Sequence, residues 1–229
     1  MDDSTATAIP YTAADVFDTP TPSAPAAPEA SDASQDPITI PAALIKAIAT
    51  WASTDTTRLP ICHVRFEGRD VVATDGHRLI LLRRGAGPSH AVPFHVPAKI
   101  LLTAARSAGA RGTVEIAPSE AVRAITAAKR GETPLITEVA AARPKTSKVA
   151  WQFPAWQHVV PSLDGELVVA AHACNPGYLA AMADVVAALG MRGTPYVSLR
   201  RCDDAMSPIV YTASGSEGDA TLVIMPCRS

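Results

Sequence analysis

A pattern that occurs three times along the chain places the strongest constraint on its fold. Each copy begins with a short apolar run, passes through a proline into an alanine- and leucine-rich helical segment, and ends in several short β-type runs. The helical segments begin at Pro41, Pro97 and Pro176. Proline suits the first position of a helix because its φ angle is fixed and its missing N–H has no helical partner there. The pattern therefore predicts three related strand–helix–strands repeats.

The ends of the three helical segments are also marked in the sequence. The apolar periodicity predicts helices that end near Ser53, Ala108 and Leu189. Asn175 directly precedes the third helical segment. Its side-chain oxygen can accept a free backbone N–H in the first turn, so we expect it to cap this helix.

Short apolar runs after each helix predict the strands. The Asp75-Gly76 step between two such runs predicts a hairpin turn. The expected strands are 61–66, 71–74 and 78–82 in the first repeat, 114–117, 122–127, 136–140 and 149–151 in the second, and 196–200, 209–213 and 221–225 in the third. Three repeats of this kind predict an α+β fold with helices on one face of antiparallel sheets.

Residues 1–37 differ in composition from the rest of the chain. They contain no Lys or Arg, seven acidic residues and six prolines, which predicts a disordered acidic leader. Residues 38–229 carry all 20 Lys and Arg residues and 15 of the 22 acidic residues. The formal net charge of −2 therefore combines an acidic leader with a mildly basic body. We expect a two-repeat domain over 38–162 and a half-domain of one repeat over 163–229.

The sequence lacks the motifs of the common hydrolases and nucleotide-binding enzymes. It contains no Gly-x-Ser-x-Gly and no His-Glu-x-x-His, and the Gly85-Ala86-Gly87 stretch lacks the Lys-Ser/Thr that completes a phosphate-binding loop. Asp75 and His77 lie two positions apart on a hairpin, so their side chains need not converge. These observations favour a non-catalytic protein that uses no cofactor.

Cysteine spacing and hydropathy bear on metals and on the compartment. The four cysteines lie far apart and form no Cys-x-x-Cys pair, so we expect neither a metal site nor a disulfide scaffold. No run approaches the roughly 18–20 apolar residues that a membrane-spanning helix needs. The N-terminus has no signal-peptide pattern. We therefore expect a cytoplasmic protein that does not insert into a membrane.

Four segments, taken in order, resemble the bacterial DNA polymerase III β sliding clamp family. They are Val-Ala-Thr-Asp-Gly-His-Arg-Leu at 72–79, Phe-Pro-Ala-Trp-Gln-His-Val-Val-Pro at 153–161, Asn-Pro-Gly-Tyr-Leu at 175–179 and Val-Ile-Met-Pro-Cys-Arg at 223–228. The resemblance covers residues 38–229 and corresponds to the middle domain and the C-terminal half of the last domain of a clamp. Trp156 stands where the family usually has Tyr, and Cys227 where it usually has Met.

The resemblance implies a function in DNA replication as a processivity factor. In the family, two chains close a ring around DNA, and a groove between the middle and last domains binds short peptides of polymerase and clamp-loader proteins. Carried over by motif, the peptide-binding residues are Ile61, Thr74, Gly76, His77, Arg78, Leu79, Pro161, Val223, Met225, Pro226, Cys227 and Arg228. The basic residues of the expected helices that could face DNA phosphates are Lys46, Lys99, Arg106 and Arg111.

Several alternatives remain at this point. The Asp75-Gly76 step could be only a turn, and the four basic residues could be solvated helix faces. The chain could also be a non-encircling adaptor or competitor derived from a clamp, without ring function. The odd third repeat would expose a sheet edge and an apolar face, so we expect a homo-oligomer in which it pairs with the third repeat of a second copy.

Overall fold

The computed structural model describes residues 36–118, 121–128, 132–141, 152–160, 174–193, 198–201 and 207–226. The described residues all belong to one compact unit, Asp32–Ser229. The expected leader up to residue 35 and the expected strand at 149–151 lie outside the described residues.

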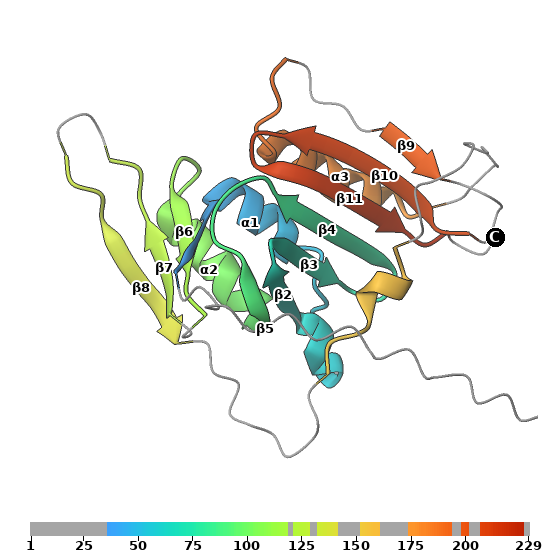
Figure 1. Cartoon of the computed structure of the whole chain (residues 1–229), viewed down its shortest axis with the longest axis horizontal. Helices are drawn as coiled ribbons and strands as arrows, with labels where there is room; N and C mark the ends of the chain where they lie inside the picture. Colours follow the sequence, from blue (N-terminus) through green and yellow to red (C-terminus); the bar gives the residue numbers. More distant parts are fainter. Residues whose placement is uncertain are drawn as a thin grey trace, which may run out of the picture. The chain divides into compact units, whose positions relative to one another are not determined.

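The described part of the chain is α+β, as predicted, with two antiparallel sheets and three α-helices (Figure 1). The first sheet has the strand order β1-β6-β7-β8, with bounds Ile38–Pro41, Thr113–Ile116, Ala121–Ile125 and Ile136–Ala141. The second sheet has the order β5-β2-β3-β4-β11-β10-β9, with bounds His90–Pro97, His63–Gly68, Asp70–Thr74, Arg78–Arg84, Gly218–Ile224, Ile209–Gly215 and Ser198–Arg201.

The first two repeats exchange their leading strands. β1 of the first repeat pairs with β6 of the second, with Ile38 opposite Ile116. In return, β5 of the second repeat pairs with β2 of the first, with His63 opposite Pro97. Neither sheet could therefore form from one repeat alone.

The third repeat joins the sheet of the first repeat. β11 pairs with β4 over seven positions, from Gly218 opposite Arg84 to Ile224 opposite Arg78. The strands of the third repeat thereby extend the first-repeat strands into one seven-stranded sheet. The expected boundary at residue 162 lies outside the described residues, so the division into a domain and a half-domain stays a prediction.

The three helices are α1 (Ala42–Ala49), α2 (Ala98–Ala108) and α3 (Pro176–Ala188). Pro176 is the first residue of α3, and Asn175 caps this helix as predicted, because its Oδ1 accepts from the backbone N–H of Gly177 at 2.9 Å. Pro41 and Pro97 lie one position earlier than expected, at the N-caps of α1 and α2.

The first helix ends earlier than the sequence indicates. Thr50 donates from Oγ1 to the carbonyl oxygen of Ala47 at 2.6 Å, and the N–H of Trp51 donates to that of Ile48. These tighter bonds stop α1 at Ala49 and turn the Trp51 side chain into the core, where it is fully buried.

A 3₁₀ segment, Thr56–Cys62, occupies the start of the strand expected at 61–66. Asp55 initiates it by accepting hydrogen bonds from both the N–H and the Oγ1 of Thr57. The strand β2 therefore begins only at His63.

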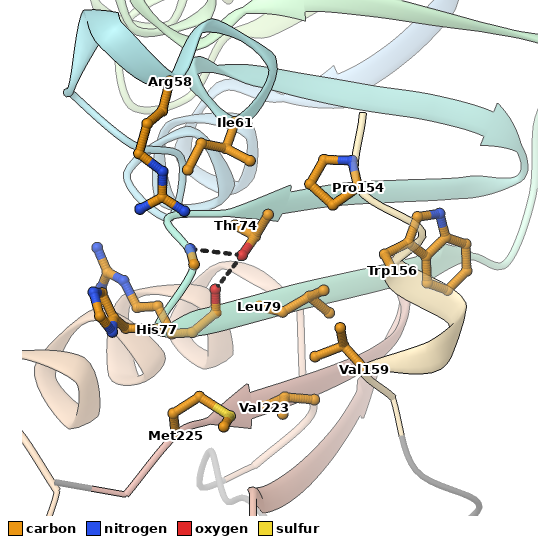
Figure 2. Close-up of a pocket in the computed structure, with 12 residues that line it drawn as sticks. Arg58, Ile61, Thr74, His77, Leu79, Pro154, Trp156, Val159, Val223 and Met225 are labelled. Atoms are coloured by element: carbon orange, nitrogen blue, oxygen red, sulfur yellow. Dashed lines mark hydrogen bonds between the residues drawn. The ribbon is translucent and has the colours of Figure 1, made fainter. Parts of the chain in front are cut away.

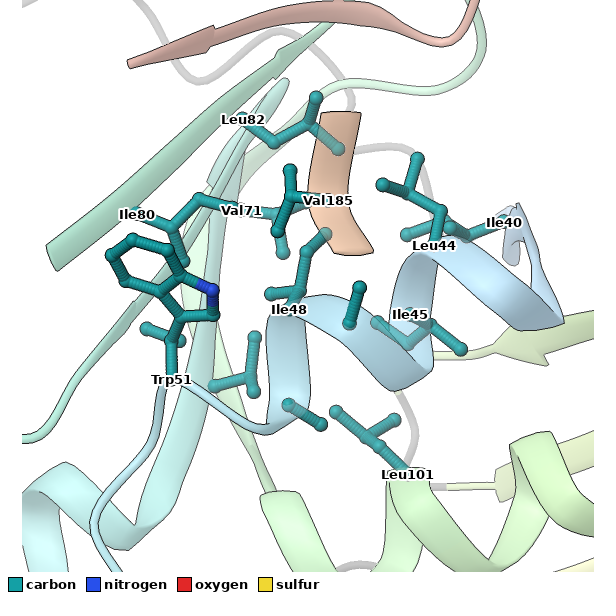
Figure 3. Close-up of a cluster of buried hydrophobic side chains, with 14 of the residues drawn as sticks. Ile40, Leu44, Ile45, Ile48, Trp51, Val71, Ile80, Leu82, Leu101 and Val185 are labelled. Carbon is teal, nitrogen blue, oxygen red and sulfur yellow. The ribbon is translucent and has the colours of Figure 1, made fainter. Parts of the chain in front are cut away.

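The main core lies between the helices and the sheets (Figure 3). α1 packs against both α2 and α3. Figure 3 labels several of its side chains: Ile40, Leu44, Ile45, Ile48, Trp51, Val71, Ile80, Leu82, Leu101 and Val185. Each such side chain contributes about 1.5–3 kcal/mol when it leaves water. The third repeat shares this core through α3, so its position on the first repeat is fixed by burial as well as by strand pairing.

Candidate functional site

A cavity of about 290 Å³ opens where the hairpin between β3 and β4 meets the end of β11 (Figure 2). Its lining combines residues of the first repeat, the 152–160 segment and the third repeat. The lining residues are Arg58, Ile61, Thr74, Gly76, His77, Arg78, Leu79, Pro154, Trp156, Val159, Val223 and Met225. The structure therefore brings together eight of the residues that the sequence resemblance assigns to one groove.

The hairpin wall is held by Thr74. Its Oγ1 donates to the carbonyl oxygen of Arg78 at 2.7 Å and accepts from the N–H of Gly76 at 3.0 Å. Gly76 has a φ of 94°, in the left-handed region that favours glycine. The turn predicted at Asp75-Gly76 is confirmed.

Asp75 acts as the cap of this turn. Its Oδ1 accepts from the N–H groups of His77 and Arg78 at 2.8 and 3.0 Å. Its Oδ2 accepts from Nε of Arg78 at 2.9 Å, in an ion pair that is mostly buried. The Asp75 carboxylate is therefore occupied by structural bonds.

Arg78 ties the hairpin to two helical elements. Its Nη2 donates to the carbonyl oxygen of Thr50 at 2.7 Å. Its guanidinium lies 5.1 Å from the ring centroids of both Trp51 and Tyr178, in the range of cation–π attraction. Arg78 lines the cavity and also joins the first repeat to α3.

The floor of the cavity is apolar. Leu79 in β4 lies opposite Val223 in β11, and both are buried in a second small core with Trp156. Met225 continues from β11, is 37% exposed, and donates from its N–H to the carbonyl oxygen of His77 at 2.8 Å. A flexible thioether at the rim of an apolar hollow can adapt its shape to different apolar side chains.

Four lining residues were not among the predicted site residues. Pro154, Trp156 and Val159 come from the 153–161 segment, which the sequence singled out as a motif but not as a wall. A short 3₁₀ turn at Trp156–His158 carries them to the cavity.

The fourth, Arg58, has no sequence signal of its own. It comes from the unexpected 3₁₀ segment and lies against Gly76, with its Nη1 3.5 Å from the carbonyl oxygen of Asp75. Because the Asp75 carboxylate is paired with Arg78, Arg58 leaves a positive charge at the rim of an apolar hollow.

The remaining predicted groove residues do not line the cavity or cannot be placed. Pro226 is described but is not part of the lining. Pro161, Cys227 and Arg228 lie outside the described residues. The peptide-binding role of the whole set stays a prediction.

The four residues predicted to face DNA are all exposed. Lys46 lies on α1, and Lys99 and Arg106 lie on α2. The placement of Arg111 on a helix was wrong, because α2 ends at Ala108 and Arg111 lies in the loop after it. Lys46 and Asp184 line the same shallow hollow between α1 and α3, so an acidic group partly offsets the positive potential there. Contact with DNA stays a prediction.

Within the residues that the structure describes, no group of three or more His, Cys, Asp or Glu side chains could hold a metal ion. None of the described helices has the length and apolar character needed to cross a membrane.

The fold resembles solved bacterial sliding clamps. Against Caulobacter crescentus polymerase III β, the TM-score is 0.52 at 18% identity, covering 87% of this chain and 68% of that one. Against the DNA polymerase III β subunit of Borrelia burgdorferi, solved with a natural product, the TM-score is 0.57 at 14% identity, covering 87% of this chain and 66% of that one. Against the Pseudomonas aeruginosa clamp bound to griselimycin, the TM-score is 0.53 at 19% identity, covering 88% of this chain and 67% of that one.

These similarities confirm the predicted resemblance at the level of the fold. The chain spans about two thirds of the length of the clamps that it matches. No protein-family model matches the sequence, and no curated protein matches it.

Proposed function

We propose that this chain, which has the fold of bacterial β sliding clamps, is a non-catalytic protein that binds short peptide segments of DNA polymerase and clamp-loader proteins. The peptide would occupy the cavity where the hairpin between β3 and β4 meets the end of β11. One observation carries the proposal: the hairpin and the end of β11, which are far apart in sequence, meet around one apolar cavity.

The chemistry of the cavity suits an extended peptide with apolar anchors. Leu79 and Val223 offer a buried floor for a Leu or Phe side chain, and Met225 adapts to its shape. Arg58 at the rim favours an acidic residue next to the anchors. A peptide of the form Gln-x-Asp-Leu-Phe, which the sliding-clamp family favours, combines these features.

Peptide titration tests this proposal. A fluorescein-labelled peptide with a Gln-x-Asp-Leu-Phe core should bind the full chain with a Kd of roughly micromolar size in fluorescence polarisation. Met225→Ala should weaken binding at least about tenfold, since it removes the adaptable wall of an apolar pocket. Val92→Ala is the matched control, because Val92 is an exposed apolar residue outside the cavity. Absence of saturable binding, or equal loss in both variants, would rule out the proposal.

A second candidate function is a processivity ring around DNA, assembled from several copies of this chain. The exposed basic residues Lys46, Lys99 and Arg106 on α1 and α2 favour it, since phosphate neutralisation drives non-specific DNA affinity. The other reading is an adaptor that binds peptides without encircling DNA.

The oligomeric mass of the protein and its retention on circular DNA distinguish the ring from the adaptor. Light scattering should give an oligomer at micromolar concentration if a ring forms. The oligomer should stay on nicked circular DNA and leave it after the DNA is cut to a linear form. A monomer that binds peptide but is not retained on circles favours the adaptor.

A further inference from the structure

Arg84 is a buried cation at the end of β4. The residue is only 6% exposed. Its Nη2 donates to the carbonyl oxygen of Pro88 at 2.6 Å, while its buried Nε has no hydrogen-bond partner in the described structure. Among the described residues, no carboxylate lies within ion-pair distance of it; its neighbour Asp70 pairs with Arg83 at 3.0 Å instead.

The surroundings of Arg84 oppose its charge. Burial lowers the pKa of its guanidinium, and the nearby charge of Arg69 lowers it further, against a smaller opposite effect of Asp70. An arginine side chain nevertheless keeps its proton in proteins. A buried charge without a counter-ion is costly, so a compensating anion at this place would stabilise the fold.

A cavity of about 220 Å³ adjoins Arg84. Three separate segments meet around it: the start of the first repeat, the loop after β4, and the turn between β10 and β11. The residues that line it are Thr39, Ile40, Leu44, Arg84, Ala86, Gly87, Ser216 and Glu217. Water takes about 30 Å³ per molecule in the liquid, so this volume accommodates a small oxyanion together with some water.

The loop after β4 is shaped around the guanidinium. Gly87 has a φ of 95°, and a Cβ at this position would lie 3.1 Å from Nη1 of Arg84. A residue other than glycine would therefore crowd the cation. The Gly85-Ala86-Gly87 stretch lacks the sequence of a nucleotide-binding loop; in the structure it packs over the side chain of Arg84.

We propose that this cavity is a binding site for a small tetrahedral oxyanion, such as phosphate or sulfate. Arg84 holds the ion with the hydroxyl of Thr39 and with that of Ser216, which turns to the ion from the Glu217 carboxylate that it contacts at 3.4 Å in the free chain. Guanidinium groups recognise such ions by paired, charge-assisted hydrogen bonds. The ion joins the three segments around the cavity. Because it binds the folded chain only, it raises the stability of the join between the first and third repeats.

Glu217 lines the same cavity, so its substitution distinguishes an anion-binding site from an ion pair between Glu217 and Arg84. If the cavity holds an anion, the negative charge of Glu217 opposes binding, and Glu217→Gln should tighten phosphate binding at least about twofold. If Glu217 itself serves as the counter-ion of Arg84, the same substitution should destabilise the chain and should not improve phosphate binding.

The experiment uses the full chain with inorganic phosphate as probe and chloride at equal ionic strength as reference. Phosphate should give a saturable signal in isothermal titration calorimetry. At ten times the Kd it should raise the unfolding midpoint by about 2–5 °C over chloride. Sulfate should act similarly and acetate more weakly, because acetate lacks the tetrahedral oxygens.

Two arginine variants complete the design. Arg84→Met keeps most of the side-chain volume and should abolish the phosphate effect. Arg83 is the preceding residue and is mostly exposed. Arg83→Met removes the same charge and should leave the phosphate effect intact. If Arg84→Met does not fold, Arg84→Lys takes its place and should weaken binding at least about tenfold, since a lysine lacks the planar fork. No saturable phosphate binding by the native chain, or equal loss in the Arg83 variant, overturns the proposal.

Discussion

Leu79 in β4 lies directly opposite Val223 in β11, and both side chains are buried in the floor of the candidate site. β4 belongs to the first repeat and β11 to the third. The cavity therefore exists only while these two repeats are joined, and changes that weaken the join should weaken peptide binding as well.

Leu79→Ala and Met225→Ala should separate stability from binding. Leu79 is 3% exposed, so its truncation should cost about 2–4 kcal/mol in the free energy of unfolding, whereas Met225 at 37% exposed should cost about 1 kcal/mol or less. Both should weaken binding of the Gln-x-Asp-Leu-Phe peptide at least about tenfold. Urea unfolding and fluorescence polarisation measure the two quantities. A Met225 variant with native affinity would contradict the assignment of the wall.

Gly76→Ala should lower both stability and peptide affinity. A Cβ at Gly76 would lie 2.7 Å from Nη2 of Arg58, and the φ of 94° disfavours alanine by about 1 kcal/mol. Gly109→Ala is the matched control, because Gly109 also has a positive φ but a Cβ there meets nothing within 4 Å. Both variants should lose similar stability in thermal unfolding, while only Gly76→Ala should displace Arg58 and weaken the peptide. Equal affinities would show that Arg58 takes no part.

The chain should lose stability as the pH falls from about 6.5 towards 4. Burial, reinforced by the nearby charges of Arg65 and His63, lowers the pKa of His95 from 6.5 to about 4. In this window the unfolded chain binds a proton at His95 that the folded chain does not, so stability rises with pH and is lost on acidification. Because His95 is only partly buried, we expect about 1–2 kcal/mol from this group.

Urea unfolding at pH 7 and pH 4.5 measures this dependence. His95→Gln should flatten the dependence of the unfolding free energy on pH. An unaltered slope in the His95 variant would assign the acid sensitivity to other groups.

Removal of the cap of α3 should destabilise the third repeat. Asn175→Ala loses the hydrogen bond to the N–H of Gly177 and should cost about 1 kcal/mol in thermal unfolding. Asn175→Asp keeps a side-chain hydrogen-bond acceptor, so its stability in thermal unfolding should stay near that of the native chain. A cost below about 0.3 kcal/mol in the alanine variant would mean that the cap is replaced by water.

The features that the sequence predicted correctly are local. The turn at Asp75-Gly76 and the cap at Asn175 depend on residues within three positions of each other, so their chemistry can be read directly from the chain. The repeat pattern likewise indicated the α+β class, because strand and helix periods are local properties.

The features that it missed depend on distant partners. Arg78 lines the cavity, and its role in peptide contact stays a prediction; its bond to Thr50 and its position over Tyr178 arise only once the repeats are packed. Arg58 reaches the cavity through a 3₁₀ segment whose start depends on the Asp55 side chain. The pairing of β4 with β11 likewise joins residues that no local periodicity connects.

The most direct test of the proposed function observes the cavity itself during a peptide titration. In a chain labelled with ¹³C at its methionine methyl groups, Met225 lines the cavity, whereas Met182 is buried in the main core. The Met225→Leu spectrum assigns the Met225 signal. Addition of the Gln-x-Asp-Leu-Phe peptide should shift the Met225 methyl resonance in a saturable way and leave that of Met182 in place. A Met225 signal that stays unchanged while the peptide binds would show that the cavity is not the binding site.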